Sequence, residues 1–125
     1  MPRFSRPSFL NPLRIQMPVG AWTSIGHRLT GILLAVVVPC GVYLLDQSLR
    51  SEQGFAEASA IFSLRPVKAL AVLLLWALSH HLLAGTRHLL SDFNIGSPLR
   101  TARRSAWFVN LGAVAVASLA AGVLL

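Results

Sequence analysis

Cysteine, acidic residues and charge of any kind are scarce in this 125-residue chain. Its single cysteine, Cys40, excludes an intrachain disulfide and an all-cysteine metal site. Only 12% of the residues are charged, and four acids stand against 11 lysines and arginines, which gives a net charge of +7. The basic residues do not form a run with interleaved aromatic residues, as a nucleic-acid surface would have, so we expect no nucleic-acid partner.

Hydrophobic residues make up 54% of the chain, which is too apolar for a soluble domain of this size. We therefore predict an all-α integral membrane protein with a single membrane-anchor domain over residues 1–125. A helix needs roughly 20 apolar residues to cross the hydrocarbon core of a bilayer, and three segments meet this condition. The predicted spans are about residues 22–49, 67–90 and 105–125.

The segments outside the predicted spans are polar or contain helix-breaking residues. Residues 1–21 hold four of the seven prolines and are predicted to form an extended arm on the membrane surface. Residues 50–66 are predicted to form a loop with at least one turn of interfacial helix. Residues 92–104 are predicted to be a polar linker, broken by Gly96 and Pro98.

Basic residues are distributed unequally between the two ends of the predicted spans. The end that carries the N-terminus has eight of them and the opposite end has three, which predicts a cytoplasmic N-terminus and a C-terminus on the other side. The eight are Arg3, Arg6, Arg14, Arg28, Arg87, Arg100, Arg103 and Arg104, and the three are Arg50, Arg65 and Lys68.

Ionisable side chains are concentrated in the second predicted span. Each costs about 2.5–3.5 kcal/mol in hydrocarbon, so we expect the chain to use them, and imidazole at this depth indicates a metal, a haem or a proton path. Gly85 and three of the polar residues share one helix face, while His80 is rotated about 100° away from it. The ionisable residues are His80, His81, Arg87 and His88, and the shared face holds His81, Gly85, His88 and Asp92.

His81 is the histidine best suited to bind a cofactor. It lies near the bilayer centre of the predicted span, and Gly85, one turn further on, would leave room for a large flat cofactor against the helix. We therefore interpret His81 as an axial haem ligand. His80 is the alternative ligand, and otherwise makes packing or partner contacts. A histidine within a span can also serve only as a hydrogen-bond donor between helices.

A second polar group is expected at the cytoplasmic side. The first two predicted helices are antiparallel, so the start of the first lies at the same depth as the end of the second. The arginines there can instead extend to the lipid headgroups, and the aspartate can simply be the charge partner of Arg87 or His88. The expected cluster consists of Ser24, His27, Arg28, Arg87, His88 and Asp92.

Two ordered motifs are prominent: SIGHRLTG at residues 24–31 and HLLAGTRHLLSD at residues 81–92. They match the patterns S-x-x-H-R-x-[ST]-G and H-x-x-x-G-x-R-H-x-x-x-D completely. In this the chain resembles the cytochrome b556 subunits of succinate dehydrogenase, respiratory complex II. The N-terminal arm is also similar to the lead-in of that family, although Asn11 and Pro12 depart from its commonest form. The resemblance covers nearly the whole chain.

The resemblance implies a role for several of these residues. His81 would supply one axial ligand to a single haem b iron, and a second small anchor subunit would supply the other. His27 and Arg28 would lie against the haem propionates. Ser24 and Arg28 would line a ubiquinone pocket. The other matched polar positions near that pocket are His88 and Asp92.

The resemblance also implies a heteromeric helical bundle in a bacterial inner membrane, with the C-terminus in the periplasm. The expected partners are the second anchor subunit, an iron–sulfur subunit, a flavoprotein subunit and the lipid bilayer. The chain itself would hold no catalytic residue for succinate, and would help to pass electrons from succinate oxidation to ubiquinone. Two alternatives remain open: the anchor of a quinol:fumarate reductase, and a haem-free membrane scaffold or transporter subunit.

Overall fold

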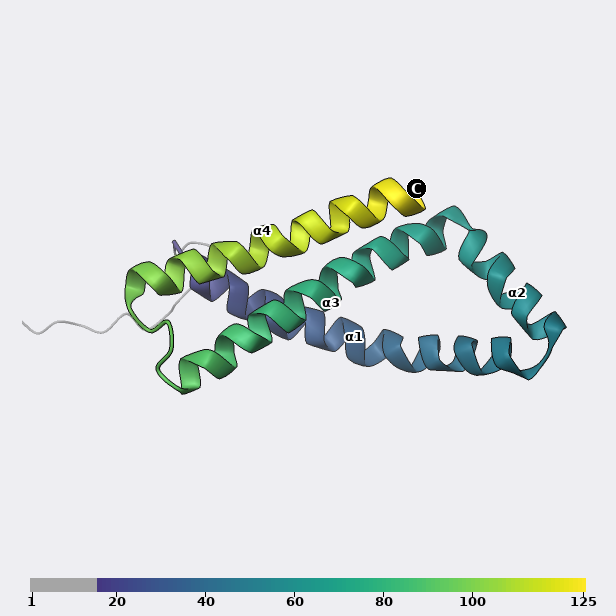
Figure 1. Cartoon of the computed structure of the whole chain (residues 1–125), viewed down its shortest axis with the longest axis horizontal. Coiled ribbons are helices and arrows are strands. Elements are labelled where there is room, and N and C mark those ends of the chain that lie inside the picture. Colours follow the sequence, from purple (N-terminus) through teal and green to yellow (C-terminus); the bar gives the residue numbers. More distant parts are fainter. Residues whose placement is uncertain (1–15) are drawn as a thin grey trace, which may run out of the picture.

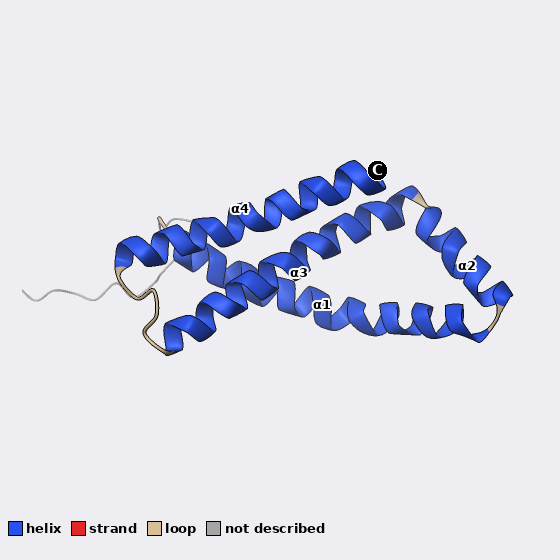
Figure 2. Ribbon diagram, in the orientation of Figure 1, coloured by secondary structure: helices blue, strands red, loops and turns tan. Residues whose placement is uncertain are grey.

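The computed structural model describes residues 16–125, and over that part of the chain it contains helices and short connections without strands (Figures 1 and 2). Three of the helices are long and apolar enough to cross a membrane. The predicted all-α fold with three apolar spans is therefore confirmed for these residues. The helices are α1 (Val19–Arg50), α2 (Glu52–Ser63), α3 (Arg65–Asp92) and α4 (Leu99–Leu124), of which α1, α3 and α4 are the apolar ones.

The N-terminal arm predicted over residues 1–21 lies mostly outside the described residues. Three arginines of the charge count, Arg3, Arg6 and Arg14, lie there too. The described part of the arm, residues 16–18, is followed directly by α1, which begins at Val19.

The three long helices run along the long axis of the molecule, and α2 lies across one end (Figure 1). Helix α3 packs against both α4 and α1. At the end opposite α2, α1 begins, α3 ends and α4 begins (Figure 1). Helices α1 and α3 cross at a point that is closer to this end than to the α2 end, and they diverge towards α2, which joins them (Figure 1). The segments that carry the histidines are therefore brought together at the crossing.

Local sequence explains where several helices begin and end. Helix α1 follows Pro18, and Ser51 caps α2 by accepting a hydrogen bond on its Oγ from the backbone N–H of Gly54 at 3.0 Å. After α3, Asn94 adopts a left-handed φ of 58°, which asparagine tolerates better than most residues. Pro98 then precedes the first residue of α4.

Two segments are more helical than predicted. Helix α2 has 12 residues, where the sequence indicated a loop with at least one helical turn. Helix α4 begins at Leu99, ahead of the predicted start at 105, so the connection after α3 shrinks to residues 93–98. The reason is that arginines at positions 100, 103 and 104 are good helix formers, and only Pro98 interrupts the helix.

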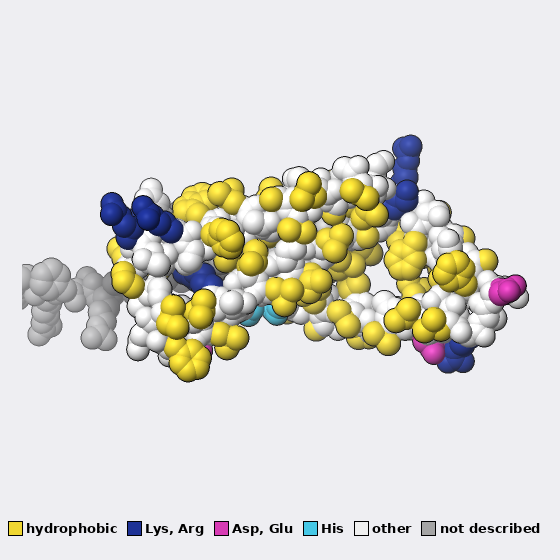
Figure 3. Space-filling model, in the orientation of Figure 1, with side chains coloured by type: hydrophobic (Ala, Val, Ile, Leu, Met, Phe, Trp, Pro, Cys, Tyr) yellow, Lys and Arg dark blue, Asp and Glu magenta, His cyan; other side chains and the backbone are white. Residues whose placement is uncertain are grey.

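Small side chains fill the interior, and the large apolar side chains face outward. The largest fully buried side chains among the described residues are Thr23 and Thr30, and alanines of α3 and α4 fill most of the rest. Leu49 is 78% exposed and Val123 is 85% exposed. Figure 3 shows hydrophobic side chains along the length of the molecule, with lysine and arginine side chains at its two ends. Helices that pack through small residues and face lipid have this arrangement.

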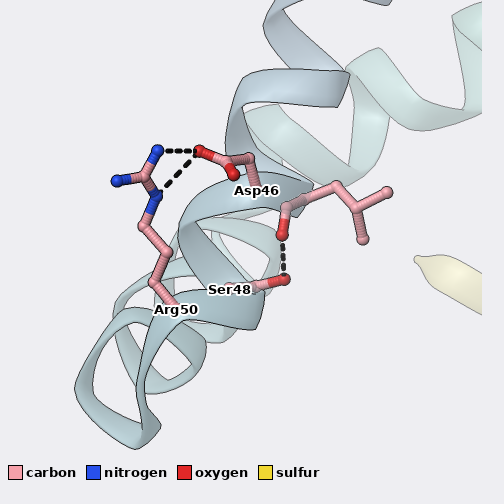
Figure 4. Close-up of polar contacts among 4 residues, drawn as sticks. Asp46, Ser48 and Arg50 are labelled. Atoms are coloured by element: carbon pink, nitrogen blue, oxygen red, sulfur yellow. Dashed lines mark hydrogen bonds and ion pairs between the residues drawn. The ribbon is translucent and has the colours of Figure 1, made fainter.

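The last turn of α1 carries an exposed polar group. Arg50 bonds Asp46 one turn earlier through Nε at 2.9 Å and through its second terminal nitrogen at 2.7 Å (Figure 4). Ser48 donates its hydroxyl to a main-chain carbonyl of the same helix at 2.7 Å (Figure 4). Exposed ion pairs of this kind contribute little to stability, so this group defines the polar end of the helix rather than a site.

Candidate functional site

Three imidazoles gather where α1 and α3 cross. His27 of α1 stacks on His81 of α3, with ring centroids 4.2 Å apart and an angle of 14° between the planes. His27 also lies beside His88, with centroids 5.2 Å apart and ring planes at 57°. We call this group of His27, His81 and His88 the imidazole cluster. Histidine side chains reach the surface near this crossing (Figure 3).

The imidazole cluster is not arranged as a site for a bare metal ion. Its rings lie against one another instead of directing their nitrogens to a common point. No group of three or more histidine, cysteine, aspartate or glutamate residues that could hold a metal ion occurs among residues 16–125. The three histidines therefore do not form a metal-ion site together, and each can have a role of its own.

One ring nitrogen of His81 is hydrogen-bonded, and the other is available to bind a ligand. Its Nδ1 lies 3.1 Å from the main-chain oxygen of His27 and 3.3 Å from Oγ1 of Thr30. Because a carbonyl oxygen only accepts hydrogen bonds, Nδ1 carries a proton, and in the neutral ring Nε2 then has a free lone pair. Nε2 has no hydrogen-bond partner among residues 16–125. Histidines that bind metals commonly have this arrangement, in which a backbone carbonyl fixes the ring and the other nitrogen is the ligand.

Glycines on the facing helices give these rings their space. A Cβ on Gly31 of α1 would lie 2.9 Å from Cε1 of His81, closer than real contacts allow. A Cβ on Gly85 of α3 would lie 3.2 Å from Nε2 of His27. We expected Gly85 to leave room for a flat cofactor, but in the structure the His27 ring occupies this space. His27 lies there because it is on the side of α1 that faces α3.

His80 points into the bundle, away from the imidazole cluster. It is 4% exposed, and its Nε2 lies 3.1 Å from Oδ1 of Asn110 on α4. Thr23 of α1 is fully buried, and its Oγ1 lies 3.3 Å from the same oxygen. Trp76 flanks the ring, with centroids 5.6 Å apart. The alternative in which His80 is the haem ligand does not fit this geometry, since its exposed fraction is small and Nε2 is occupied.

Ser24 and Arg28 lie one turn apart at the start of α1. Ser24 is half-buried and Arg28 is exposed. Neither side chain makes a hydrogen bond to another of the described residues, whereas Thr23 and Thr30 on the same helix both bond carbonyls of α1. The hydroxyl and the guanidinium therefore keep their donors available for a ligand or another subunit.

Arg87 forms hydrogen bonds to α4. Its Nε donates to Oγ of Ser105 at 3.1 Å, and one terminal nitrogen donates to the main-chain oxygen of Ala102 at 3.3 Å. Arg87 also lines a cleft of about 340 Å³ between α3 and α4. Neither Ser24 nor Arg28 lines this cleft. The guanidinium therefore bonds α4 and also lies beside Gly20 of α1, one turn before Ser24.

Asp92 is exposed in the last turn of α3. Within residues 16–125, the only ion pair joins Arg50 and Asp46. The interpretation of Asp92 as the charge partner of Arg87 or His88 is therefore wrong for the described part of the chain. The physical reason is that Arg87 already bonds α4 and His88 lies against His27.

Sequence reasoning missed three residues that hold the histidines in place: Thr23, Thr30 and Asn110. A signal for Asn110 was present, because it is the only amide in the otherwise apolar run from 105 to 125, and polar groups in a span usually bond another helix. The threonines gave a weaker signal, since a threonine hydroxyl can be satisfied within its own helix.

Comparison with known proteins gives consistent matches over most of the chain. The family model described as Succinate dehydrogenase/Fumarate reductase transmembrane subunit matches residues 2–121. The succinate dehydrogenase cytochrome b556 subunit of Coxiella burnetii (strain RSA 493 / Nine Mile phase I) is 33% identical over 105 residues, which cover 83% of this chain and 84% of that protein. The protein of the same name from Paracoccus denitrificans is 33% identical over 106 residues, covering 83% and 80%.

Proposed function

The chain belongs to the succinate dehydrogenase/fumarate reductase transmembrane subunit family, and on this premise we propose that it is an anchor subunit that binds haem b and ubiquinone. Its three long apolar helices suit the membrane role. The name cytochrome b556 of its relatives implies a haem b. In this proposal, succinate is oxidised on a flavoprotein subunit, an iron–sulfur subunit carries the electrons, and this chain helps to bind the quinone that receives them.

The orientation of His81 is the observation that carries the proposal. Its Nδ1–H is fixed by the main-chain oxygen of His27, and its Nε2 has no partner among residues 16–125. This nitrogen would bind the iron of a haem, for which an imidazole with a fixed tautomer is suited. Haem b, when bound, supplies a centre that accepts and releases one electron. A second small anchor subunit is proposed to provide another ligand to the iron.

His27 and Arg28 are proposed to meet the haem propionates. Arg28 is exposed in the first third of α1 and makes no ion pair among the described residues, so its guanidinium is available to bond a carboxylate. His27 is adjacent to it and lies against the proposed ligand His81. Arg28 would thus neutralise charge at the membrane boundary, and His27 would donate a hydrogen bond.

Ser24 and Arg28 are proposed to hold the quinone head group. Their free donors lie one helical turn apart, and a hydroxyl and a guanidinium can both bond a quinone carbonyl oxygen. Reduction of the quinone requires two electrons and two protons, and the protons must reach these carbonyl oxygens. His88 and Asp92, at the same end of the bundle, are candidates for residues near the pocket.

The proposed location is a bacterial inner membrane, with the N-terminus in the cytoplasm and the C-terminus in the periplasm. Basic residues support this orientation, because the end where α1 begins carries more of them than the α2 end. A quinone pocket at the cytoplasmic end would take electrons and protons from one side of the membrane. No net charge would then cross the bilayer.

The family description also covers fumarate reductases. An anchor of a quinol:fumarate reductase would have the same fold and would work in the reverse direction. The catalytic subunit and the quinone potential decide the direction, so assays of the whole complex for succinate oxidation and fumarate reduction distinguish the two.

The experiment that tests the haem assignment is a reduced-minus-oxidised difference spectrum of the purified complex. We expect a low-spin b-type spectrum in the parent complex, and its loss or conversion in His81→Ala. The control is Ser79→Ala, which removes a hydroxyl that bonds only its own helix, at the carbonyl of Leu75. A normal bis-histidine spectrum in His81→Ala would show that His81 is not the ligand.

A further inference from the structure

A buried polar group joins α1, α3 and α4 beside the proposed haem ligand. It consists of His80, Asn110 and Thr23, and we call it the His80 group. His80 is 4% exposed and Thr23 is fully buried. Both lie within hydrogen-bonding distance of Oδ1 of Asn110, at 3.1 and 3.3 Å. The proposed roles in haem and quinone binding use none of these three residues.

The hydrogen bond to Asn110 defines the tautomer of the neutral His80 ring. Because Oδ1 of Asn110 only accepts, Nε2 of His80 carries the proton and donates it. Nδ1 is then an acceptor, and it is buried without a hydrogen-bond partner in the described part of the chain. A buried acceptor without a partner is unfavourable, and an apolar side chain of similar size would avoid that cost. Packing alone therefore does not explain a histidine here.

The ring of His80 cannot easily turn in its site. A Cβ on Gly26 of α1 would lie 2.7 Å from Cε1 of His80, so the ring edge is pressed against the α1 backbone. Asn110 holds the ring from the α4 side. The rotation of α3 about its own axis is therefore restrained by the contacts of His80 with α1 and α4.

Adjacent residues of a helix are about 100° apart around its axis, so contacts that fix the rotation of the helix at one residue also fix the Cα–Cβ direction of the next. His80 and His81 are such a pair, and both contact α1, at Gly26 and Gly31. The ring of His81 itself is bonded through Nδ1 to the main-chain oxygen of His27, lies near the hydroxyl of Thr30 and stacks on the His27 ring. The His80 group provides the remaining restraint.

We propose that His80 is a positioning residue which, through Asn110, sets the direction in which His81 presents Nε2 to the haem iron. The proposal rests on the proposed function of His81 as the ligand. It also explains why only one of two neighbouring histidines is available: Nε2 of His80 is occupied by Asn110, and Nε2 of His81 is left free.

The test uses the complete complex and electron paramagnetic resonance of its oxidised haem. The largest g value of a low-spin ferric haem with two imidazole ligands depends on the angle between the two ring planes, so it reports the orientation of the proposed ligand. His80→Leu and Asn110→Leu each remove the hydrogen bond, and each should shift this g value and the reduction potential of the haem. His80→Gln places an amide donor near the position of Nε2 and should keep the parental g value.

A double variant makes the test independent of the folding of the single variants. His80→Leu combined with Asn110→Leu removes both partners, so no buried polar atom of this pair is left unpaired, and the chain should still assemble. If the two residues act through one bond, the double variant should show the same shift as the single ones, without a further increment.

The outcomes separate this proposal from the haem assignment. A parental g value and potential in the double variant, with haem bound, would overturn the positioning role and leave His81 as the ligand. Failure of the double variant to assemble while His80→Gln assembles would also overturn it, because the group would then be needed for folding. A parent complex without haem, or an unchanged spectrum in His81→Ala, would overturn both proposals.

Discussion

Replacement of Gly31 by alanine tests whether the His81 ring of α3 packs directly against the α1 backbone at Gly31. The added Cβ would lie 2.9 Å from Cε1 and 3.4 Å from Nδ1 of His81, whereas ordinary contacts begin at 3.4 Å. The ring must therefore retreat by about 0.5 Å, or the two helices must separate, and overpacking of this kind costs about 1–3 kcal/mol.

The retreat of the ring is opposed by its own hydrogen bond. Nδ1 of His81 lies 3.1 Å from the main-chain oxygen of His27, and movement away from Gly31 must lengthen or bend this contact. Gly31→Ala should therefore both destabilise the complex and disturb the proposed haem ligand. We expect a lower haem content or a shifted haem spectrum together with a lower Tm.

Gly41→Ala in the same helix is the matched control, since nothing lies within 4 Å of a Cβ built there. Both variants gain the same higher helix propensity of alanine, worth up to about 1 kcal/mol, so the difference between them isolates the contact with His81. The assay is thermal unfolding of the detergent-purified complex, followed by haem absorbance. Equal Tm values and equal spectra for the two variants would refute the close packing of α1 on His81.

The other predictions concern quinone binding, assembly and the polar end of α1. Ser24→Ala should raise the KM for quinone about fivefold, as expected for a lost hydrogen bond of roughly 1 kcal/mol, while succinate oxidation with a soluble dye persists. Ser91→Ala, whose hydroxyl bonds only its own helix, is the control, and unaltered quinone kinetics in Ser24→Ala would move the quinone role to other residues. Expressed without partner subunits, the chain should not hold haem stably, and stoichiometric haem in the isolated chain would contradict a shared ligand set. Ser51→Ala removes the cap of α2 and should cost about 1 kcal/mol, measured as faster hydrogen exchange of the α2 amides. Asp46→Asn breaks the exposed pair with Arg50 and should leave Tm unchanged, so a clear loss would show that this pair matters more than its exposure indicates.

Sequence patterns were sufficient for the helical class and for most of the residues that meet at the α1–α3 crossing. Apolar length predicted three spans, and the antiparallel order predicted that His27 and His88 come together, as they do. Helix ends were less predictable. The start of α4 depended on Pro98 and not on the arginines after it, because charge does not interrupt a helix whereas proline does.

Contacts that depend on helix rotation could not be read from the sequence. That His80 bonds Asn110 depends on how α3 and α4 are rotated against each other, and small apolar residues on both helices permit several rotations. Arg87 illustrates the same limit. Its position along α3 was clear from the sequence, but its bond to Ser105 follows from the way α4 packs on α3.

The crossing of α1 and α3 lies near one end of α1, and this asymmetry affects how the protein responds to its membrane. Helix α1 has 32 residues and is about 48 Å long, while the hydrocarbon core is about 30 Å thick. Such a helix adapts to changes in bilayer thickness by tilting. Because α1 crosses α3 close to the histidines, tilting of α1 about this crossing moves its α2 end far and its histidine end very little. The histidine region, where we propose that haem binds, would therefore keep its geometry when lipid composition or temperature changes the thickness of the membrane, and the opposite end would move instead.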